Sequence, residues 1–573
     1  MWRLAAILAF ALAAAAFVVL RTGPPPEPPN ILLVTIDTLR ADAVGKGKGT
    51  PAMEGFLSEA TRFLGARTVA PLTLPAHASM FTGLLPARHR IHDNVSEPLP
   101  PRGVRPFPLL AEEMRDKGYA TAAFVSCSVL GEATGIASGF DTFDCPPGLE
   151  GWSHGGSSPG DERAAAAARW IAEAPAKKPW FVWVHLFDPH KPYGAFAGDA
   201  GRPAVRESDP LPALYMGGVR RADVAFERLL AAAGPDAVVI LVSDHGEGLM
   251  EHDESEHGPL CYGSTVDAVL AVRGPGFRRG AEDRALRSVA DVAPTVRALS
   301  GIPAREGDGA DLLGPPHAML VTESLYTWRI HGWGQCFAVA DGAYTLVESG
   351  PRLELFDKRS DPGETRPLPL SDPAYERLDR ELERFRAAEA LAFGGDMISS
   401  LPAYGSVRRR VSGYLPRHEN AHLLDTRANL KDWMALETLP LTIRTSITRR
   451  DPAPLVEALR RLGELEGRWP TSPRVSQYRG MALSVLADLT RDRSYLRQAV
   501  WAQIQAVEKG YVDKETIRPA VSLSIAAPDR DALRSLIQLL ARVGYRPDAD
   551  TARALEEAAA ALGIRGEPLP APR

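Results

Sequence analysis

Between Asn30 and about residue 350, the chain alternates short runs of mainly apolar residues with longer amphipathic stretches. Continuous apolar runs are typical of strands buried on both faces of a sheet. Five such runs are Ile31–Ile36, Ala120–Val125, Trp180–Leu186, Ala237–Val242 and Ala268–Val272. Apolar residues at helical spacing predict helices over Met53–Leu64, Glu162–Ala172, Leu211–Ala233 and Ser288–Ser300. The alternation predicts an α/β fold, specifically an α/β/α sandwich with a mostly parallel central sheet.

The pattern changes after about residue 370. A strand and a turn around Leu353–Thr365 close the first region, and beyond it Ala, Leu, Arg and Glu recur at helical spacing. Helices are predicted over Leu455–Leu465, Gln477–Leu489, Tyr495–Val507, Asp531–Val543 and Ala552–Leu562. Residues 371–573 are therefore expected to form an all-α region that resembles stacked helix pairs of irregular period. Such a region offers a surface for a protein partner.

The N-terminal segment is apolar from Leu4 to Leu20, between Arg3 and Arg21. This run is slightly shorter than the roughly 20 residues of a typical membrane span, and it also resembles the core of a signal peptide. No small-x-small cleavage site follows it, so an uncleaved anchor is expected, with the rest of the chain exported to the periplasm or the cell exterior. Residues 1–29 then comprise the anchor and a Pro-rich spacer, and residues 30–370 the catalytic domain.

Composition narrows the function classes. The chain has 573 residues, 45% of them hydrophobic, and 66 Lys+Arg against 71 Asp+Glu give a net charge of −5. This balance argues against a nucleic-acid binder, which would be basic, and the apolar content argues against disorder. The four cysteines form neither a disulfide scaffold nor a zinc pattern. Export would make a disulfide chemically possible, for which Cys127 and Cys145 are the plausible pair, whereas Cys261 and Cys336 are equally well explained as buried free thiols.

Three of the predicted strands end in side chains that bind metals. Asp37 directly follows the first strand, and Asp244 and His245 follow the fourth. The third strand brings His185, with Asp188 and His190 just after it. In α/β sheets, ligands bind beyond the carboxyl ends of the strands. Any one of these residues alone is equally well explained as a helix cap or a packed ring, but three such ends in one sheet favour a divalent metal site.

A fourth segment, Thr73–Gly83, contributes a hydroxyl. Pro75 suits the first turn of a helix, so Thr73 is expected at or near the helix N-cap. Free backbone N–H groups and the positive end of the helix dipole favour a bound anion there. Taken alone, such a hydroxyl is more often only a cap, and its significance comes from the other three segments.

Together these segments resemble the sulfatase family of the alkaline-phosphatase superfamily. The first strand, Asn30–Asp42, resembles the metal-ligand strand of that family, and Thr73–Gly83 lies over its Cys/Ser-x-Pro-x-Arg-x-x-x-x-Thr-Gly signature. Further matches are Thr50–Leu57, Ser243–His252, Glu256–Gly258 and Leu355–Glu364. The resemblance covers roughly residues 29–370. It implies a three-layered fold, exported hydrolysis of anionic esters and a divalent metal ion.

Two departures from the family pattern change the expected chemistry. The family nucleophile is a Cys or Ser that is oxidised to formylglycine, but this chain has Thr73, whose oxidation would give a ketone. The signature Arg is replaced by His77. Superfamily relatives use a Thr nucleophile for phosphate chemistry. Thr38 stands where many sulfatases carry a second acidic ligand. With Asp37, Thr73, Asp244 and His245 as ligands, zinc or manganese is as well suited as calcium or magnesium.

The resemblance and the residues together predict the mechanism. Thr73 would attack the ester, and a set of histidines would contact its oxygens and protonate the leaving alcohol: His77, His185, His190 and His257. An alternative places Asp188, His190 and His257 around a second metal ion. The expected function is hydrolysis of phosphoesters, or phosphoryl transfer, through Thr73. Two alternatives remain: sulfate-ester hydrolysis without formylglycine, and a decayed catalytic domain whose helical region binds partners.

Overall fold

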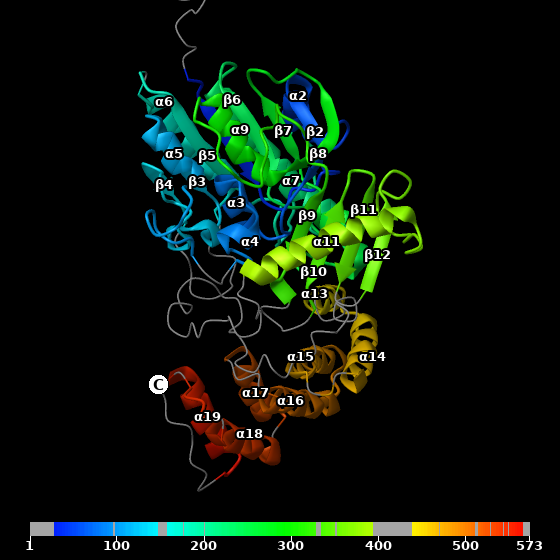
Figure 1. Ribbon diagram of the computed structural model, residues 1–573. Coiled ribbons are helices and arrows are strands. Elements are labelled where there is room, and N and C mark those ends of the chain that lie inside the picture. The colour runs from blue at the N-terminus through cyan, green and yellow to red at the C-terminus, as the bar shows by residue number, and fades with distance from the viewer. Residues whose placement is uncertain are drawn as a thin grey trace, which may run out of the picture.

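The computed structural model describes residues 28–392, apart from 95–97, 147–157, 176, 200, 328–333 and 350–351, and residues 438–564, apart from 469, 471, 510–513, 528, 543 and 548. The predicted anchor and most of its spacer lie outside the described residues. Within the described part, none of the helices has the length and apolar character needed to span a membrane. The chain forms a large α/β unit followed by a stack of helices (Figure 1).

The central sheet has eight strands in the order β4-β3-β5-β1-β6-β7-β2-β8. Their bounds are Ile31–Ile36 (β1), Thr61–Arg67 (β2), Ala120–Val125 (β3), Thr142–Asp144 (β4), Trp180–Leu186 (β5), Val238–Ser243 (β6), Leu270–Arg273 (β7) and Glu282–Ser288 (β8). Only β7 runs antiparallel to its neighbours, β6 and β2. The mostly parallel sheet expected from the sequence is therefore confirmed.

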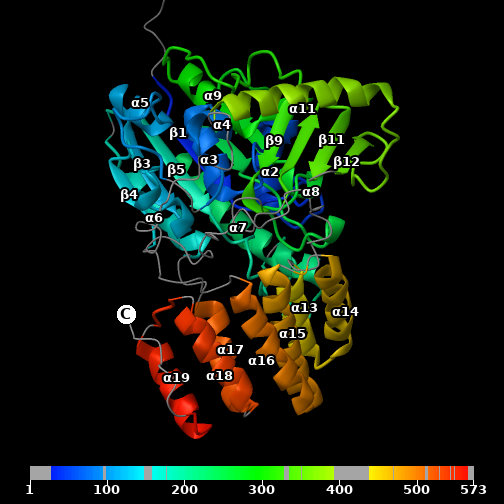
Figure 2. The same cartoon turned by 60° about the horizontal axis from the view of Figure 1, so that its bottom comes forward.

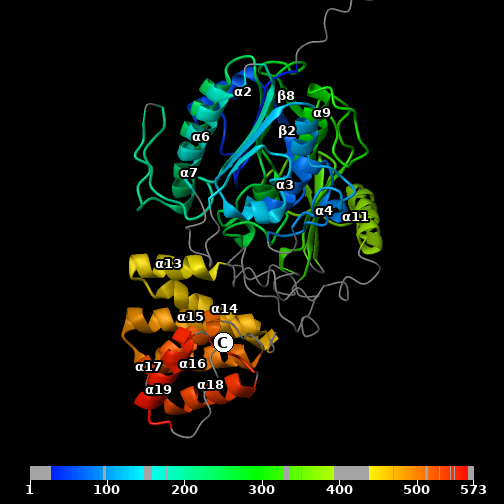
Figure 3. The ribbon, with the colours of Figure 1, turned by 90° about the vertical axis from the view of Figure 1, so that its left-hand side faces the viewer.

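Helices cover both faces of this sheet (Figure 3). On β1, Ile31 and Leu33 pack into an apolar cluster on one face, while Leu32, Val34 and Ile36 pack into a cluster on the other. The first face is covered by α3 (Thr73–Thr82), α5 (Leu110–Asp116) and α9 (Val292–Leu299), and the second by α2 (Pro51–Glu59), α6 (Gly160–Glu173) and α7 (Leu211–Ala233). The central strands β1, β5 and β6 therefore bury both of their faces, which explains their continuous apolar runs.

A second, antiparallel sheet follows, of which the sequence predicted only one strand and a turn. Its order is β12-β11-β10-β9, with bounds Leu320–Ser324 (β9), Cys336–Ala340 (β10), Tyr344–Ser349 (β11) and Arg352–Asp357 (β12). Helix α11 (Pro373–Ala392) packs on one face, where Leu378 and Leu382 meet Phe337, Leu346 and Leu355. By packing, α11 belongs with this sheet, although it lies beyond the boundary expected at residue 370.

Between residues 438 and 564, the elements that the structure describes are all helices, as expected (Figure 2). They are α13 (Leu439–Arg449), α14 (Ala453–Arg468), α15 (Pro473–Thr490), α16 (Arg493–Glu508), α17 (Lys514–Ala526), α18 (Arg530–Arg542) and α19 (Ala549–Ala561). The other face of the second sheet shares one apolar cluster with these helices, including Cys336, Ala338 and Phe356 from the sheet and Leu455, Leu462 and Tyr478 from α14 and α15. The second sheet is therefore enclosed between α11 and the helical region.

Cys127 and Cys145, the plausible disulfide pair, are not bonded to each other. All four cysteines are free thiols, and the Cys145 thiol donates instead to the carbonyl oxygen of Cys127, at 3.5 Å. Cys261 and Cys336 are buried, as expected, and Cys261 Sγ lies 3.7 Å from the carbonyl oxygen of Cys336.

Candidate active site

Strand register brings the two acidic strand ends together. On β1, Ile36 pairs with Leu186 of β5 on one side and with Ser243 of β6 on the other. Asp37 and Asp244 are the next residues along β1 and β6, so they leave the sheet side by side at its carboxyl edge. Both carboxylates are fully buried.

His245 completes a cluster with these two carboxylates. Its Nε2 lies 3.5 Å from Asp244 Oδ2 and 3.9 Å from Asp37 Oδ1. These three atoms have no hydrogen-bond partner in the structure, although all are buried. His245 Nδ1 donates to the carbonyl oxygen of Gly246 at 2.9 Å, which leaves the lone pair of Nε2 directed to the cluster. Three unpaired ligand atoms thus converge on one place.

The electrostatics of the two carboxylates fit a bound cation. Burial and the charge of Asp37 raise the pKa of Asp244 well above its ordinary value. Burial alone would raise the pKa of Asp37, but a hydrogen bond from His185 and the charges of nearby histidines lower it instead. The protein groups alone therefore stabilise one negative charge, not two. A divalent cation would allow both to ionise, and the mixed set of oxygen and nitrogen donors suits zinc or manganese while also accepting calcium or magnesium.

Thr73 is the first residue of α3, and Leu72 is its N-cap. The Thr73 hydroxyl donates to Asp37 Oδ2 at 3.3 Å, so it lies next to the carboxylate cluster. The first helical turn offers fewer free N–H groups than expected, because the N–H of Leu74 donates to Asn94 Oδ1 at 2.9 Å and Pro75 has none. The expectation of an open anion site at this helix start is therefore wrong in part.

His77 has both ring nitrogens occupied by protein atoms. Nδ1 donates to the carbonyl oxygen of Thr73 at 2.7 Å, and Nε2 accepts from the Thr35 hydroxyl at 3.1 Å. The same hydroxyl accepts the Trp183 Nε1–H at 2.9 Å. Burial, reinforced by nearby His185, lowers the pKa of His77 to about 3, so the ring is neutral. His77 lies close enough to His185 and Asp244 to form a second metal-like group, but its Nδ1 carries a proton and cannot serve as a ligand there.

The other three predicted site histidines lie beside the carboxylate cluster, and the rings of His245, His257 and His190 follow one another in a row, here called the histidine chain. His185 Nε2 lies 3.3 Å from Asp37 Oδ2, and its Nδ1 is buried without a hydrogen-bond partner. The rings of His245 and His257 lie 4.3 Å apart, and those of His257 and His190 lie 5.2 Å apart. His190 stacks on Phe187 at 4.1 Å. The structure thus brings His185, His190 and His257 to the same edge as the carboxylates.

Glu247 is a site residue that the sequence reasoning missed. His257 Nδ1 donates to Glu247 Oε1 at 2.9 Å, and the Tyr193 hydroxyl donates to Glu247 Oε2 at 2.7 Å. Burial lowers the pKa of His257, but the carboxylate of Glu247 outweighs this effect and raises it above its ordinary value. The position of Glu247, two residues after His245 in Asp-His-Gly-Glu, was the available signal.

One carboxylate oxygen of Asp188, Oδ1, has protein partners, whereas Oδ2 is buried without a hydrogen-bond partner. Its Oδ1 accepts the backbone N–H of Gly160 at 3.4 Å and lies 3.9 Å from Arg221 Nε. Asp188, His190 and His257 are not among the groups of described side chains whose ligand atoms lie within 4.8 Å of one another. The geometry therefore gives no support to the alternative of a second metal ion.

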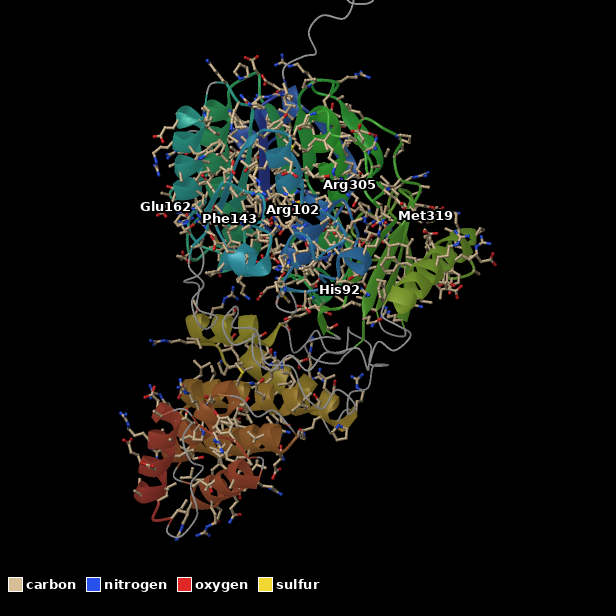
Figure 4. The ribbon with its side chains drawn as sticks, turned by 60° about the vertical axis from the view of Figure 1, so that its left-hand side comes forward. His92, Arg102, Phe143, Glu162, Arg305 and Met319 are labelled. Carbon is tan, nitrogen blue, oxygen red and sulfur yellow. The ribbon has the colours of Figure 1, made fainter. Side chains whose placement is uncertain are left out.

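His92, which pairs with Glu323 at 2.6 Å, lies at the edge of the α/β unit that faces the helical region (Figure 4).

Comparisons with known proteins agree with this architecture. Residues 29–302 match the family model described as Sulfatase. The chain is 22% identical over 424 residues to a delta 4,5-hexuronate-2-O-sulfatase of Bacteroides thetaiotaomicron, which covers 61% of this chain and 86% of that protein. It is 24% identical over 423 residues to a choline-sulfatase of Rhizobium meliloti, covering 58% of this chain and 81% of the relative.

The fold is also that of solved sulfatase structures. A 2-O GAG sulfatase superposes with a TM-score of 0.53 at 20% identity, over 69% of this chain and 99% of that one. The matched residues contain the strand ends, the Thr73 helix and the Asp-His-Gly-Glu segment described above. Through residues 29–302, the chain therefore matches the sulfatase family, and its α/β unit has the fold of solved sulfatases.

Proposed function

We propose that this protein is an exported phosphoester hydrolase or phosphoryl transferase in which Thr73 is the nucleophile. The observation that carries the proposal is the contact between the Thr73 hydroxyl and Asp37 Oδ2, at 3.3 Å, beside three unpaired ligand atoms. A threonine cannot be oxidised to formylglycine, so its hydroxyl is the group available for attack. Hydroxyl nucleophiles that form covalent intermediates are suited to phosphoryl transfer.

Asp37 Oδ1, Asp244 Oδ2, His245 Nε2 and the Thr73 hydroxyl are the atoms that would hold a divalent cation. When bound, such a cation lowers the pKa of a coordinated hydroxyl and withdraws charge from the ester oxygens. The protein holds the groups in place: His245 through its bond to Gly246, and Asp244 through the backbone N–H groups of Thr38 and His245, at 3.1 and 2.8 Å.

In the proposed reaction, the Thr73 oxygen attacks phosphorus while its proton passes toward Asp37 Oδ2, to which it is hydrogen-bonded. The bond from Thr73 oxygen to phosphorus forms, and the bond from phosphorus to the alcohol oxygen breaks. The departing alcohol takes a proton from an imidazolium. Water then hydrolyses the phosphothreonine, or a second alcohol accepts the phosphoryl group, and Thr73 regains its proton.

His257 is best suited to donate the leaving-group proton. Its Nδ1 bond to Glu247 holds the ring and favours the protonated form, while Nε2 is left for the substrate. His190 is the second candidate, because its Nδ1 donates to the carbonyl oxygen of Lys191 and Nε2 remains. His185 orients Asp37, and His77 holds the backbone of Thr73, which places both one contact away from the ester.

Export and membrane attachment are part of the proposal and rest on the sequence of Leu4–Leu20 and the Pro-rich spacer. Partner binding by the helical region is likewise a proposal. A sulfate ester is the second candidate substrate, favoured by the names of the relatives, among them a hexuronate-2-O-sulfatase and a choline-sulfatase.

The test is a comparison of 4-nitrophenyl phosphate, bis(4-nitrophenyl) phosphate and 4-nitrophenyl sulfate on the purified full chain after loading with each candidate metal. Turnover of a phosphate ester is expected, reduced at least about a thousandfold in Thr73→Ala and retained in part in Thr73→Ser. Turnover that survives Thr73→Ala would exclude this nucleophile. Preference for the sulfate ester would favour the second candidate, and absence of both turnover and bound metal would favour the decayed scaffold.

A further inference from the structure

The site segments contain very few permanent positive charges. The four segments 31–42, 73–83, 185–193 and 243–257 carry only Arg40 and Lys191. His77 occupies the signature Arg position and is neutral. Within these segments, Arg40 and Lys191 are therefore the two side chains that could make a charge-assisted contact with an anionic substrate outside the metal ligands.

Arg40 is already committed to the protein. Its guanidinium makes two bonds to Asp42, both at 2.9 Å, one ion pair with Glu251 at 2.9 Å, and a hydrogen bond to the carbonyl oxygen of Glu247 at 2.8 Å. Its side chain is 11% exposed. These contacts fix the loop after His245 rather than present a charge to a ligand.

Lys191 has a different environment. Its ammonium forms an ion pair with Glu256, and the two side chains are 20% and 39% exposed, whereas Thr73 is 2% exposed. The carbonyl oxygen of Lys191 accepts from His190 Nδ1 at 2.8 Å, so the lysine directly adjoins the histidine chain. Lys191 is thus more exposed than the candidate leaving-group acid His257, whose side chain is 6% exposed, and its partner Glu256 directly precedes His257 in the sequence.

Backbone hydrogen bonds within the loop that contains Glu256 fix the position of its backbone. The Gly248 N–H donates to the carbonyl oxygen of Glu256 at 2.6 Å, and the Met250 N–H donates to that of Glu254 at 2.8 Å. A side chain at Gly248 would lie 2.5 Å from the carbonyl oxygens of Glu254 and Glu256, so only glycine allows this closure. The backbone of Glu256 is therefore fixed, while its carboxylate remains accessible.

We propose that Lys191 and Glu256 form a subsite for a second anionic group, carried on the alcohol portion of the ester. The inference rests on the proposed function and adds the substrate class to it: an ester whose leaving group bears its own negative charge. An incoming anion replaces Glu256 as the partner of Lys191, so the ammonium stays paired and the exchange costs little desolvation. A neutral leaving group cannot make this exchange.

The experiment compares 3-carboxyphenyl phosphate with 3-carbamoylphenyl phosphate, which differ in charge but hardly in shape. Binding to the metal-loaded full chain carrying Thr73→Ala is measured by calorimetry, and the ratio of the two affinities is the readout. The subsite predicts a preference for the carboxylate that falls about tenfold with Lys191→Met and rises with Glu256→Gln, because the competing carboxylate is removed. Arg206→Met, which removes a charge that is 85% exposed on a neighbouring segment, is the matched control and leaves the ratio unchanged.

Two results would overturn the subsite: no preference for the carboxylated ester, or a preference that Lys191→Met does not reduce. Failure of the proposed function looks different, because it concerns turnover by the chain with Thr73 intact. A Lys191-dependent preference in binding, without cleavage of either ester, would refute the hydrolase and leave the subsite standing. Cleavage of both esters with a ratio insensitive to Lys191→Met would refute the subsite alone.

Discussion

His77 donates a hydrogen bond from Nδ1 to the carbonyl oxygen of Thr73, at 2.7 Å. The residue at the signature arginine position therefore holds the backbone of the proposed nucleophile. His77→Ala removes the ring's hydrogen bonds to this carbonyl and to the Thr35 hydroxyl, which keeps only its bond from Trp183, and should lower the free energy of unfolding by about 2–4 kcal/mol. It should also reduce kcat about tenfold or more by misplacing Thr73. Because the pKa of His77 is about 3, the pH profile of kcat above pH 5 should keep its shape.

Denaturant unfolding and pH–rate profiles check this prediction. The matched control is His89→Ala, which removes another buried ring, one that bonds to the Ser79 hydroxyl at 2.9 Å, and should cost stability without a comparable loss of kcat. A shift of the kcat inflection near neutral pH in His77→Ala would instead identify His77 as an acid or base.

Removing the negative charge of Asp244 should affect Tm differently in the metal-free and the metal-loaded protein. In metal-free protein, Asp244→Asn relieves the repulsion with Asp37 and keeps an oxygen that accepts from Thr38 and His245, so Tm should rise or stay level. The gain in Tm on adding manganese or zinc should disappear in the variant, since stabilisation by a ligand scales with its affinity. Thermal melts with chelator and with metal, together with elemental analysis, measure both effects.

The control for this prediction is Asp223→Asn, which alters a buried carboxylate that accepts from the Met53 N–H and pairs with Arg202. Its metal-dependent gain in Tm should match that of the unaltered protein. Retention of the full gain by Asp244→Asn would remove Asp244 from the ligand set.

Asp188 should make stability fall as pH rises. Burial raises the pKa of Asp188 from 3.8 to about 6. Because the folded state binds this proton more tightly than the unfolded state, the penalty is absent below about pH 4, grows up to about pH 6, and then levels off at no more than about 3 kcal/mol. Asp188→Asn keeps an acceptor for the Gly160 N–H and should be more stable than the unaltered chain at pH 8, with a difference that shrinks toward pH 4.

Unfolding free energies measured from pH 4 to pH 8 give this difference directly. Asp209→Asn, at a surface turn where the carboxylate accepts the Arg206 N–H, is the comparison and should show no such rise with pH. A difference for Asp188→Asn that is constant over this range would contradict the assignment of the raised pKa.

Substitutions on the two faces of the second sheet should loosen different helices, because each face packs against its own set. Phe356 and Leu355 are neighbours on β12, but Phe356 packs in the cluster shared with α14 and α15, and Leu355 packs against α11. Either substitution by Ala should cost about 2–5 kcal/mol. Hydrogen exchange should increase in α14 and α15 for Phe356→Ala, and in α11 for Leu355→Ala. The same pattern of exchange in both variants would mean that the helical region does not share a core with the sheet.

The elements that the sequence predicted best are those buried on both faces. The bounds of β1, β3 and β5 match the apolar runs, because no polar alternation obscures their limits. The predicted helix Met53–Leu64 ran on into β2, which begins at Thr61. Strand pairing of β2 with β7 and β8 decides this stretch, and such pairing joins residues too distant in sequence for a local pattern to reveal.

The positions of the site residues followed from the ends of the strands, but their partners did not. Because β1 and β6 pair in parallel with Ile36 opposite Ser243, the next residues, Asp37 and Asp244, lie side by side. The two bonds of His77 and the pairing of His257 with Glu247 depend on side-chain directions that spacing does not encode. A histidine beside a carboxylate cluster therefore could not be assigned to the ester or to the scaffold from its position alone.

The closure of the loop between Gly248 and Glu256 has an entropic consequence. Its backbone is ordered when the chain folds, so a substrate that binds at this rim does not have to order the loop itself. Preorganisation of this kind leaves more of the intrinsic contact energy to appear as affinity and as alignment of the reacting atoms. In the proposed reaction, the glycine at position 248 would thus contribute without touching the substrate, by making the rim rigid in advance.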